Sequence, residues 1–301
     1  MTFLELLKRF PDEQSCIDYY LKIRYPDGVH CNHCGSPRVY MRKTQNKAFD
    51  CYDCKNTFSP FKDTIFEHSS TDMRKWFYAI HLFLNGKKGI SALQLQREIG
   101  VTYKTAWRML QQIRTAMGNI QQKEFFDTII EMDETYVGGK PRKDNDHDDL
   151  GSGGAGHTGR ATSKTPVIGA VDRYSKRVYA RVSLPDKDGR RLSFKQLLNV
   201  LEQVSKPENG NTIITDELNY YDRLSSANYI HLRVNHKTTY ASGEVHTNNI
   251  ESFWATLKRG VYGIYHHVSV KHMQRYVDEF CFRYNNRETD MFSMVLGQAL
   301  I

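Results

Sequence analysis

The sequence predicts a multidomain α+β fold, with a small cysteine-rich unit near its start, a helical region after it and an α/β domain in its second half. Three observations lead to this prediction. Four cysteines stand in two close pairs, apolar residues recur at helical spacing between residues 70 and 117, and runs of β-branched residues begin beyond residue 122. Because 301 residues exceed what one hydrophobic core usually holds, we expect domains at residues 1–64, 65–122 and 123–301.

Composition favours a folded protein with a polyanionic partner. Hydrophobic residues make up 40% of the chain, and 42 Lys and Arg against 34 Asp and Glu leave a formal charge of +8, which favours phosphate neutralisation. This charge alone does not establish nucleic-acid binding. No stretch reaches the roughly 18 apolar residues that span a bilayer, and the first residues lack a secretory pattern. We therefore expect a cytoplasmic protein without a membrane partner.

The first segments expected to be regular are helices. Apolar side chains recur every three or four positions over residues 2–25, and Pro26-Asp27-Gly28 ends this run with turn-forming residues. A further helix is expected to begin after residues 70–72, whose Ser, Thr and Asp side chains can cap it, and to stop at Asn85-Gly86.

The two cysteine pairs between these helices indicate a metal site. Their spacing is CxxC, sixteen residues, CxxC, which lets two hairpin knuckles present four thiolates to one ion. The predicted zinc ligands are Cys31, Cys34, Cys51 and Cys54. Four unrelated thiols or disulfides are the alternatives, and iron fits the ligands equally well, although the adjoining basic region favours zinc.

Residues 90–117 have the layout of a helix-turn-helix. Two short helical patterns flank Gly100-Val101-Thr102, and the second would bury Ala106, Met109, Leu110 and Ile113. Its exposed face, and so the predicted DNA contact, would consist of Tyr103, Lys104, Thr105 and Arg108. Trp107 is expected to be a packing anchor. The alternative is a plain amphipathic hairpin with a solvated basic face.

Beyond residue 122 the pattern changes to strands. Strands are expected over residues 128–137, 166–171, 177–182, 212–215 and 229–234, with a helix over 193–204 and two helices at the C-terminal end. Strands first, followed by alternation with helices, is the order of an RNase H-like domain. Residues 139–165 are rich in Gly, Asp and Lys and are expected to form a mobile surface insertion.

Three acidic residues in this domain could meet. Asp133 and Asp216 each end an apolar strand, and Glu251 stands beside the apolar stripe of a later helix, with Lys258 two turns further on the same side. Three hard oxygen donors can hold two Mg²⁺ ions that activate a nucleophile for phosphodiester cleavage. Each acid alone is weak evidence. Glu134 and Glu217 are alternative ligands, whereas Asp172 is expected in a turn, and Asp278 and Glu279 on a solvated helix face.

Four stretches of the sequence together resemble a known family. They are EMDETYVGGK at residues 131–140, HTNNIESFW at 246–254, LKRG at 257–260 and QRYVDEF at 274–280. They closely resemble the bacterial insertion-sequence transposases of family 1595, which are related to the eukaryotic Merlin elements. The resemblance covers nearly the whole chain, because that family also carries an N-terminal zinc ribbon followed by a helical region.

The resemblance implies a DDE-type transposase that nicks element ends and joins 3′-hydroxyls to target DNA with Mg²⁺ or Mn²⁺. Asp133 and Asp216 match the first two acids of that family. Glu251 or Asn248 would be the third, and we favour Glu251 because its charge binds metal better. Lys258 matches the basic partner that contacts phosphate, and Arg259 lies in a basic, aromatic segment suited to DNA.

The expected partners are double-stranded DNA, both element ends and target, and further copies of the chain, since two ends must be held together. Two alternatives remain at this point. One is a zinc-ribbon DNA-binding regulator with an inactive RNase H-like domain, and the other is a structure-specific nuclease that cleaves without joining. The sequence does not determine the terminal repeat, the target preference, the order of strand cleavage or the number of copies.

Overall fold

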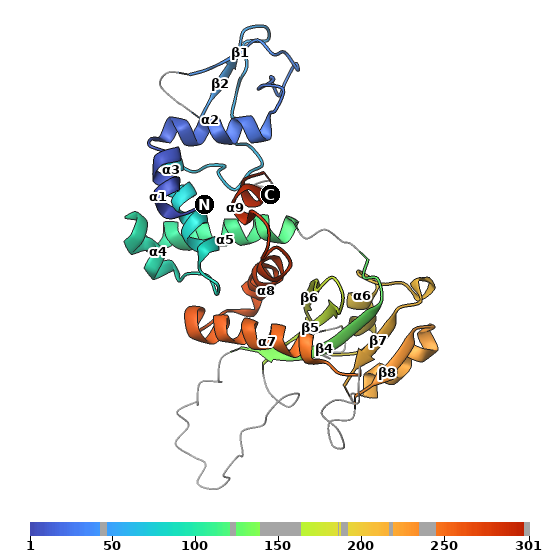
Figure 1. Ribbon diagram of the computed structural model, residues 1–301. Helices are drawn as coiled ribbons and strands as arrows, with labels where there is room; N and C mark the ends of the chain where they lie inside the picture. Colours follow the sequence, from blue (N-terminus) through green and yellow to red (C-terminus); the bar gives the residue numbers. More distant parts are fainter. Residues whose placement is uncertain are drawn as a thin grey trace. The chain divides into compact units, whose positions relative to one another are not determined.

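The computed structural model describes residues 1–42, 47–120, 125–138, 164–185, 187, 192–216, 219–234 and 245–297 (Figure 1). The chain divides into two compact units, the first made of residues 1–120 together with 288–301, and the second of residues 121–287. This division lies next to the boundary expected at residue 122. The last helix, α9 (Met291–Gly297), packs with the first unit, whereas the sequence assigned it to the C-terminal domain. The insertion expected at 139–165 lies almost wholly outside the described residues.

The first unit begins with two helices, α1 (Phe3–Arg9) and α2 (Glu13–Arg24), where the sequence predicted one continuous helical region. Pro11 follows the end of α1, and proline cannot continue a helix because it lacks the backbone N–H and clashes with the preceding turn. Asp12 then caps α2 by accepting a hydrogen bond from Ser15 N.

Three short strands follow α2. They are β1 (Val39–Met41), β2 (Phe49–Cys51) and β3 (Thr57–Phe58), paired antiparallel in the order β1-β2-β3. Phe49, Phe58 and two of the cysteines, Cys31 and Cys51, form their core. A core of this size is too small to stabilise a fold unaided, which is consistent with a metal-stabilised ribbon.

The helix-turn-helix layout predicted for the next segment is confirmed. Its two helices are α4 (Ala92–Ile99) and α5 (Tyr103–Ile120), and the helix before them, α3 (Met73–Asn85), contacts both. Asp72 caps α3 by accepting from Arg74 N, and Gly100 ends α4 in the left-handed conformation that favours glycine. Phe292 of α9 completes this core against Phe77 of α3.

The second unit is built on a five-stranded sheet with the strand order β6-β5-β4-β7-β8. The first three strands, β4 (Ile129–Val137), β5 (Thr165–Asp172) and β6 (Val178–Val182), pair antiparallel. β7 (Thr212–Thr215) pairs parallel with β4, and β8 (Ile230–Arg233) pairs parallel with β7. Three antiparallel strands with two parallel strands added beyond the first is the topology of the RNase H-like fold, as the sequence predicted.

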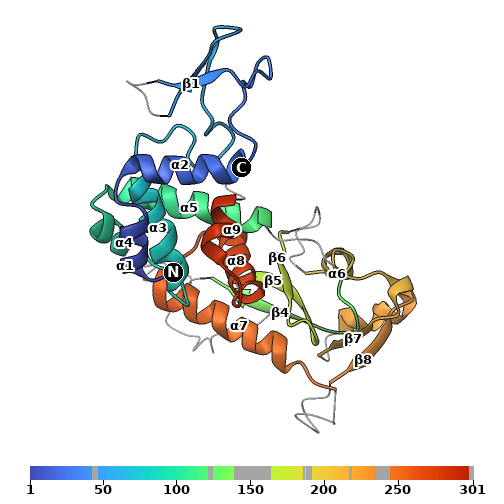
Figure 2. The same cartoon turned by 45° about the horizontal axis from the view of Figure 1, so that its top comes forward.

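Helices cover both faces of this sheet (Figures 1 and 2). On one face, α6 (Phe194–Leu201) and the 3-10 segment η3 (Asn219–Ala227) pack against Met132, Ile168 and Ala170. On the other, α7 (Asn248–Gly260), the π-helical turn η4 (Val261–Tyr265) and α8 (Val270–Asn285) pack against Val167 and Val171. A short 3-10 turn, η2 (Pro207–Asn209), precedes β7. Every residue of β5 is buried, because both of its faces are covered.

Side chains of α8 cover the outer edge of β6. Asn285 Oδ1 accepts from Val178 N and its Nδ2 donates to Val178 O, while Gln274 Oε1 accepts from Val182 N. An edge strand otherwise presents unpaired backbone groups that can pair with another chain. These two amide side chains therefore satisfy this edge within the unit.

Helix α8 also corrects one expectation. Asp278 and Glu279, predicted on a solvated face, are buried, with 8% and 0% of their surfaces exposed. Both Glu279 oxygens accept from Tyr265 Oη, and one also accepts from Arg283 Nε at 2.9 Å, so the buried charge is paired. The sequence missed this because the partner Tyr265 comes from the preceding turn.

Within the described ranges, no helix combines the length and apolar character that crossing a bilayer requires.

Candidate active site and cysteine cluster

The two aspartates of the sequence analysis lie side by side, although Asp133 lies within β4 rather than at the strand end expected from the sequence, because β4 continues along β5 to Val137. The parallel pairing of β4 with β7 sets Glu131 beside Ile214, and the same register carried two residues further sets Asp133 beside Asp216. Carboxylate oxygens of Asp133, Asp216 and the neighbouring Glu134 lie within 4.8 Å of one another. Oxygen donors gathered in this way suit a hard divalent cation such as Mg²⁺ or Mn²⁺.

Glu251 lies in the first turn of α7, with an exposed side chain. Its Oε1 accepts a hydrogen bond from Thr247 Oγ1 at 2.8 Å. Among the described acids, the group gathered within 4.8 Å contains Glu134 rather than Glu251. The charge of Glu251 nevertheless acts on Asp133, because it contributes to raising the pKa of that carboxyl group. The alternative ligand Glu217 lies outside the described residues.

The electrostatics of this cluster favour a cation. Burial, as the largest cause, and the negative charges of Glu134, Asp216 and Glu251 together raise the pKa of Asp133 to about 8, against the opposing effect of a hydrogen bond from the backbone of Glu134. Neighbouring carboxylates disfavour the charged form of this carboxyl group. A bound divalent cation would offset their repulsion and favour the charged form. Perturbed acids of this kind are concentrated in functional sites.

Two aromatic side chains orient these acids. Trp254 Nε1 donates to Asp133 Oδ2 at 3.1 Å, and Tyr221 Oη donates to Glu134 Oε2 at 3.1 Å. Burial raises the pKa of Tyr221 well above its ordinary value, so the phenol remains a donor. Gly169, which pairs with Asp133 on β5, lies under the indole: a Cβ there would stand 2.6 Å from Trp254 Cη2. The indole can occupy this place only over a glycine.

The other residues expected at this site lie along α7. Asn248 is the first residue of the helix and is exposed. Lys258 is half-buried in the last turn, and Arg259 is exposed with its guanidinium donating to Thr256 Oγ1. The apolar stripe predicted for this helix is confirmed, because its members are buried: Ile250, Phe253, Trp254, Leu257 and Val261.

The helix-turn-helix residues divide into two groups. Tyr103 and Lys104 are exposed at the start of α5, and Thr105 is half-buried with its backbone N–H bound to Thr102 Oγ1. Arg108 differs from the expectation of a free basic face: it is half-buried, and its Nη2 donates to the backbone carbonyl of Glu67. Trp107, expected as a packing anchor, is 36% exposed.

The four cysteines of the ribbon form one cluster. Their sulfur atoms lie within 4.8 Å of one another, with Cys31 to Cys54 and Cys34 to Cys51 both at 3.6 Å. Tetrahedral zinc with bonds of about 2.3 Å requires sulfur atoms about 3.8 Å apart, so the spacing fits. Hydrogen bonds, first of all from the Cys54 backbone, lower the pKa of Cys51 to about 7 and favour its thiolate, whereas burial and hydrogen bonds to the other cysteines raise the pKa of Cys34.

Sequence reasoning missed a cluster around Glu131. This side chain is 0% exposed and contacts Arg173 and Asn249, with His246 Nδ1 at 3.4 Å from Glu131 Oε1. One signal in the sequence could have indicated it: Glu131 stands between apolar residues, Ile130 and Met132, in the predicted strand, and a carboxylate that is buried there needs partners.

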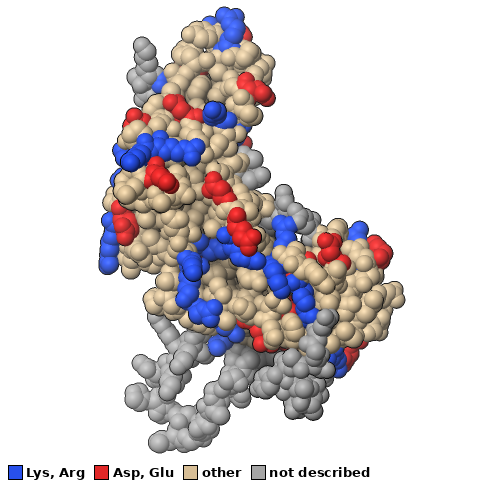
Figure 3. Space-filling view, in the orientation of Figure 1, with Lys and Arg blue, Asp and Glu red and all other residues tan. Residues whose placement is uncertain are grey.

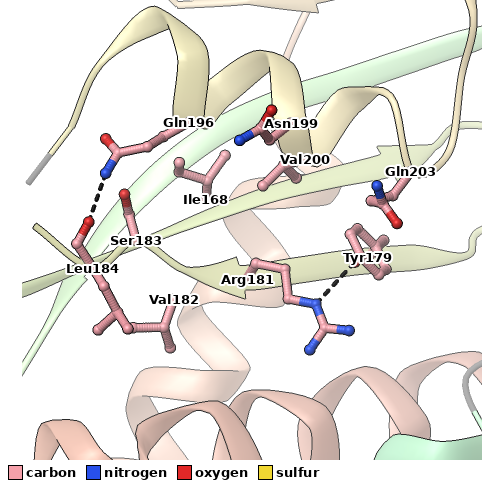
Figure 4. A pocket seen from close by; sticks show the side chains of 10 residues that line it. All are labelled: Ile168, Tyr179, Arg181, Val182, Ser183, Leu184, Gln196, Asn199, Val200 and Gln203. Carbon is pink, nitrogen blue, oxygen red and sulfur yellow. Dashed lines mark hydrogen bonds between the residues drawn. The ribbon is translucent and has the colours of Figure 1, made fainter. Parts of the chain in front are cut away.

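A separate pocket lies between β6 and α6 (Figure 4). It has a volume of about 350 Å³ and is lined by ten residues, among them Ile168, Arg181 and Gln196. Its polar groups are partly engaged with one another, because Arg181 Nε donates to Tyr179 Oη and Gln196 Nε2 donates to Leu184 O. None of the acids described above lines this pocket.

Comparison with known proteins gives matches to both units of the chain. Residues 126–285 match the ISXO2-like transposase domain, and residues 11–57 match the transposase zinc-ribbon domain. A protein in transposable element ISH50 of Halobacterium salinarum is 30% identical over 278 residues, covering 85% of this chain and 87% of that protein. A transposase-like protein of Haemophilus influenzae is 29% identical over 104 residues, covering 35% of this chain and 82% of that protein.

Among solved structures, a pre-cleavage Mos1 transpososome matches over 75% of this chain and 79% of its own, with 12% identity and a TM-score of 0.30. Both matched domain models are transposase domains, one over the RNase H-like unit and the other over the zinc ribbon. The chain belongs to the ISXO2-like transposase family, which confirms the family indicated by the sequence motifs.

Proposed function

We propose that this protein is an insertion-sequence transposase that binds terminal inverted repeats and catalyses metal-dependent DNA cleavage and strand transfer. One observation carries the proposal: the parallel β4–β7 register brings Asp133, within β4, beside Asp216, directly after β7, and the charge of Glu251 acts on the same site. The family to which the chain belongs supports it.

Asp133, Asp216 and Glu251 would hold Mg²⁺ or Mn²⁺, with Glu134 as the alternative to Glu251 and Asn248 as a further oxygen ligand or positioning group. Such ions, when bound, activate the attacking oxygen and stabilise the leaving oxygen of a phosphodiester. Trp254 orients Asp133 throughout. Lys258, on the same helix as Glu251, contacts a phosphate near the reacting bond. No covalent bond between protein and DNA is required.

The first unit supplies DNA recognition in this proposal. Cys31, Cys34, Cys51 and Cys54 hold a structural zinc ion, because four thiolates at tetrahedral spacing complete its coordination. Tyr103, Lys104 and Thr105 at the start of α5 face a DNA groove, as the second helix of such a motif does. Arg108 stabilises the first unit by its hydrogen bond to the backbone carbonyl of Glu67, and it could contact DNA only if that bond broke.

Basic side chains of the second unit extend the DNA contact. Figure 3 shows Lys and Arg side chains gathered over the region of α7 and α8. Arg259, Lys271 and Arg275 are exposed on these helices, together with Tyr262. Lys and Arg neutralise DNA phosphates, so this surface suits double-stranded DNA, either element end or target. Because two ends must be joined to one target, we propose that the protein acts as a homo-oligomer on DNA.

Labelled element ends incubated with a plasmid target and Mg²⁺ test the proposal. Wild-type protein should cleave the ends and join them, whereas Asp133→Ala and Asp216→Ala should bind the ends and do neither. Asp222→Ala is the matched control, since this aspartate is exposed in the same unit and pairs only with Arg233 in the described interactions. A protein that cleaves without joining would be a structure-specific nuclease. A protein whose DNA-dependent activity survives both substitutions would be a regulator, and either result overturns the proposal.

A further inference from the structure

We propose that Glu131 is a positioning residue, which fixes the start of α7 on β4 and thereby places Glu251 against Asp133. This inference rests on the proposed function, in which Glu251 and Asp133 share a metal ion. Glu131 lies two residues before Asp133 on β4, so both side chains leave the strand on the face that α7 covers. Its carboxyl group is fully buried although it carries no proposed chemistry.

Glu131 acts as the missing cap of α7. The residue before the helix, Thr247, makes no side-chain capping bond. Instead, Glu131 Oε2 accepts from the backbone N–H groups of Asn249 at 2.8 Å and Ile250 at 3.2 Å, and Glu131 Oε1 accepts from Asn249 Nδ2 at 2.7 Å. The first N–H groups of a helix lack partners within it, and a negative charge there is favourable. Glu131, a strand residue distant in sequence, therefore caps the N-terminus of α7, a role that the residue directly before a helix usually fills.

The carboxyl group of Glu131 is itself held from the turn that follows β5. Arg173 donates to Glu131 Oε1 through Nε and Nη2, both at 3.0 Å, and its Nη2 also donates to the backbone carbonyl of His246 at 2.9 Å. Lys176 Nζ donates to Asn249 Oδ1 at 3.2 Å. A buried carboxylate paired and hydrogen-bonded in this way keeps one geometry, because each alternative would leave a buried charge unpaired.

These contacts place Glu251 between two attachments of α7 to β4. Glu131 binds the helix at Asn249 and Ile250, directly before Glu251, and Asp133 accepts from Trp254, which is three residues after it. Both attachments are short hydrogen bonds to the same strand. The separation of Glu251 from Asp133 is therefore set by β4 itself, rather than by the long connection from β8 to α7. Loss of the Glu131 attachment leaves the first turn of α7, which carries Glu251, without its backbone hydrogen bonds to β4, so that packing and the Lys176–Asn249 hydrogen bond remain.

The test is Glu131→Gln in zinc-loaded protein without DNA, with Mn²⁺ binding measured by titration. The Kd for Mn²⁺ should rise about tenfold, since residues that orient metal ligands affect affinity on this scale. Amide hydrogen exchange of the segment containing Asn249 and Ile250 should accelerate in the same variant. Glu279→Gln is the matched control: Glu279 is equally buried and is paired with Arg283 and Tyr265 on the same face of the sheet. Its Kd for Mn²⁺ should stay within about twofold of wild type.

The outcomes separate the inference from the proposed function. Wild-type protein that binds no Mn²⁺ overturns the metal site and the inference together. Wild-type binding with an unchanged Kd in Glu131→Gln overturns the inference alone, as does an equal rise in Glu279→Gln, which would make the effect general destabilisation. Should Glu131→Gln fail to fold, Asn249→Ala removes the side-chain hydrogen bonds of Asn249 with Glu131 and Lys176 but keeps the backbone N–H bonds to Glu131, and its Kd should rise about threefold, the equivalent of one net hydrogen bond. An unchanged Kd in Asn249→Ala would then overturn the inference.

Discussion

Replacing Asp133 by Asn should stabilise the metal-free protein at neutral and alkaline pH. The pKa of Asp133 is raised from its ordinary 3.8 to about 8 by burial and by the charges of Glu134, Asp216 and Glu251. The folded protein therefore holds a proton that the unfolded chain releases at lower pH. The stability that Asp133 confers is complete below about pH 4 and is lost as the pH rises towards about 8, whereas Asn has no proton to lose.

The size of the effect follows from the same pKa. A difference from 3.8 to about 8 corresponds to at most about 6 kcal/mol, at about 1.36 kcal/mol for each pH unit. Asp133 keeps partial contact with solvent, which weakens the effect, so we expect Asp133→Asn to gain about 2–3 kcal/mol over wild type near pH 8. Mg²⁺ should reverse the order, because the ion stabilises only the carboxylate of the wild type.

Urea denaturation at acidic and at alkaline pH measures this difference. Both proteins are kept zinc-loaded, in buffer freed of Mg²⁺ and Mn²⁺, so that the ribbon remains intact. Wild type should lose more unfolding free energy than Asp133→Asn between about pH 5 and about pH 8. Equal losses in the two proteins, or a gain from the substitution that Mg²⁺ does not reverse, would refute the reasoning.

Three further predictions concern packing, zinc and DNA. Gly169→Ala should displace the Trp254 indole, cost about 1–3 kcal/mol in urea denaturation and shift the tryptophan emission; an unchanged emission would contradict the packing. Cys34→Ser should lower bound zinc, counted by elemental analysis, below one ion per chain; full zinc content would exclude this cysteine as a ligand. Lys104→Ala should weaken binding to element ends and reduce its salt dependence, whereas Arg108→Ala should mainly lower thermal stability; the reverse pattern would show that Arg108 faces DNA.

The sequence predicts the elements of this protein well, because each has a local cause. The apolar run before Asp133, the capping side chain of Asp72 and the Gly100 turn act within a few residues of their own positions. The break between α1 and α2 was missed, although Pro11 marks it. Apolar residues recur at helical spacing on both sides of Pro11, so periodicity alone predicted one helical region. The proline ring nevertheless requires the first helix to end there.

The candidate site was predictable in part. Asp133 and Asp216 meet because β4 and β7 are neighbours in parallel register; the sequence predicted their meeting from two strand ends, although only Asp216 follows one. The roles of Glu131, Tyr221 and Gly169 could not be read from the sequence, since their partners come from elements 40 to 120 residues away in the chain and depend on which faces the helices cover. Sequence periodicity predicts which face of a strand or helix a residue lies on, but it does not predict which residue of another element packs against it.

A crystal structure of the protein soaked with Mn²⁺ tests the central claim most directly, because anomalous scattering locates the ion without assumptions about its ligands. The account predicts a peak bound by carboxylate oxygens of Asp133 and Asp216, at about 2.2 Å, with Glu251 completing the protein ligands. Mn²⁺ found only elsewhere, with Asp133 and Asp216 still facing each other and unbound at saturating metal, would contradict it.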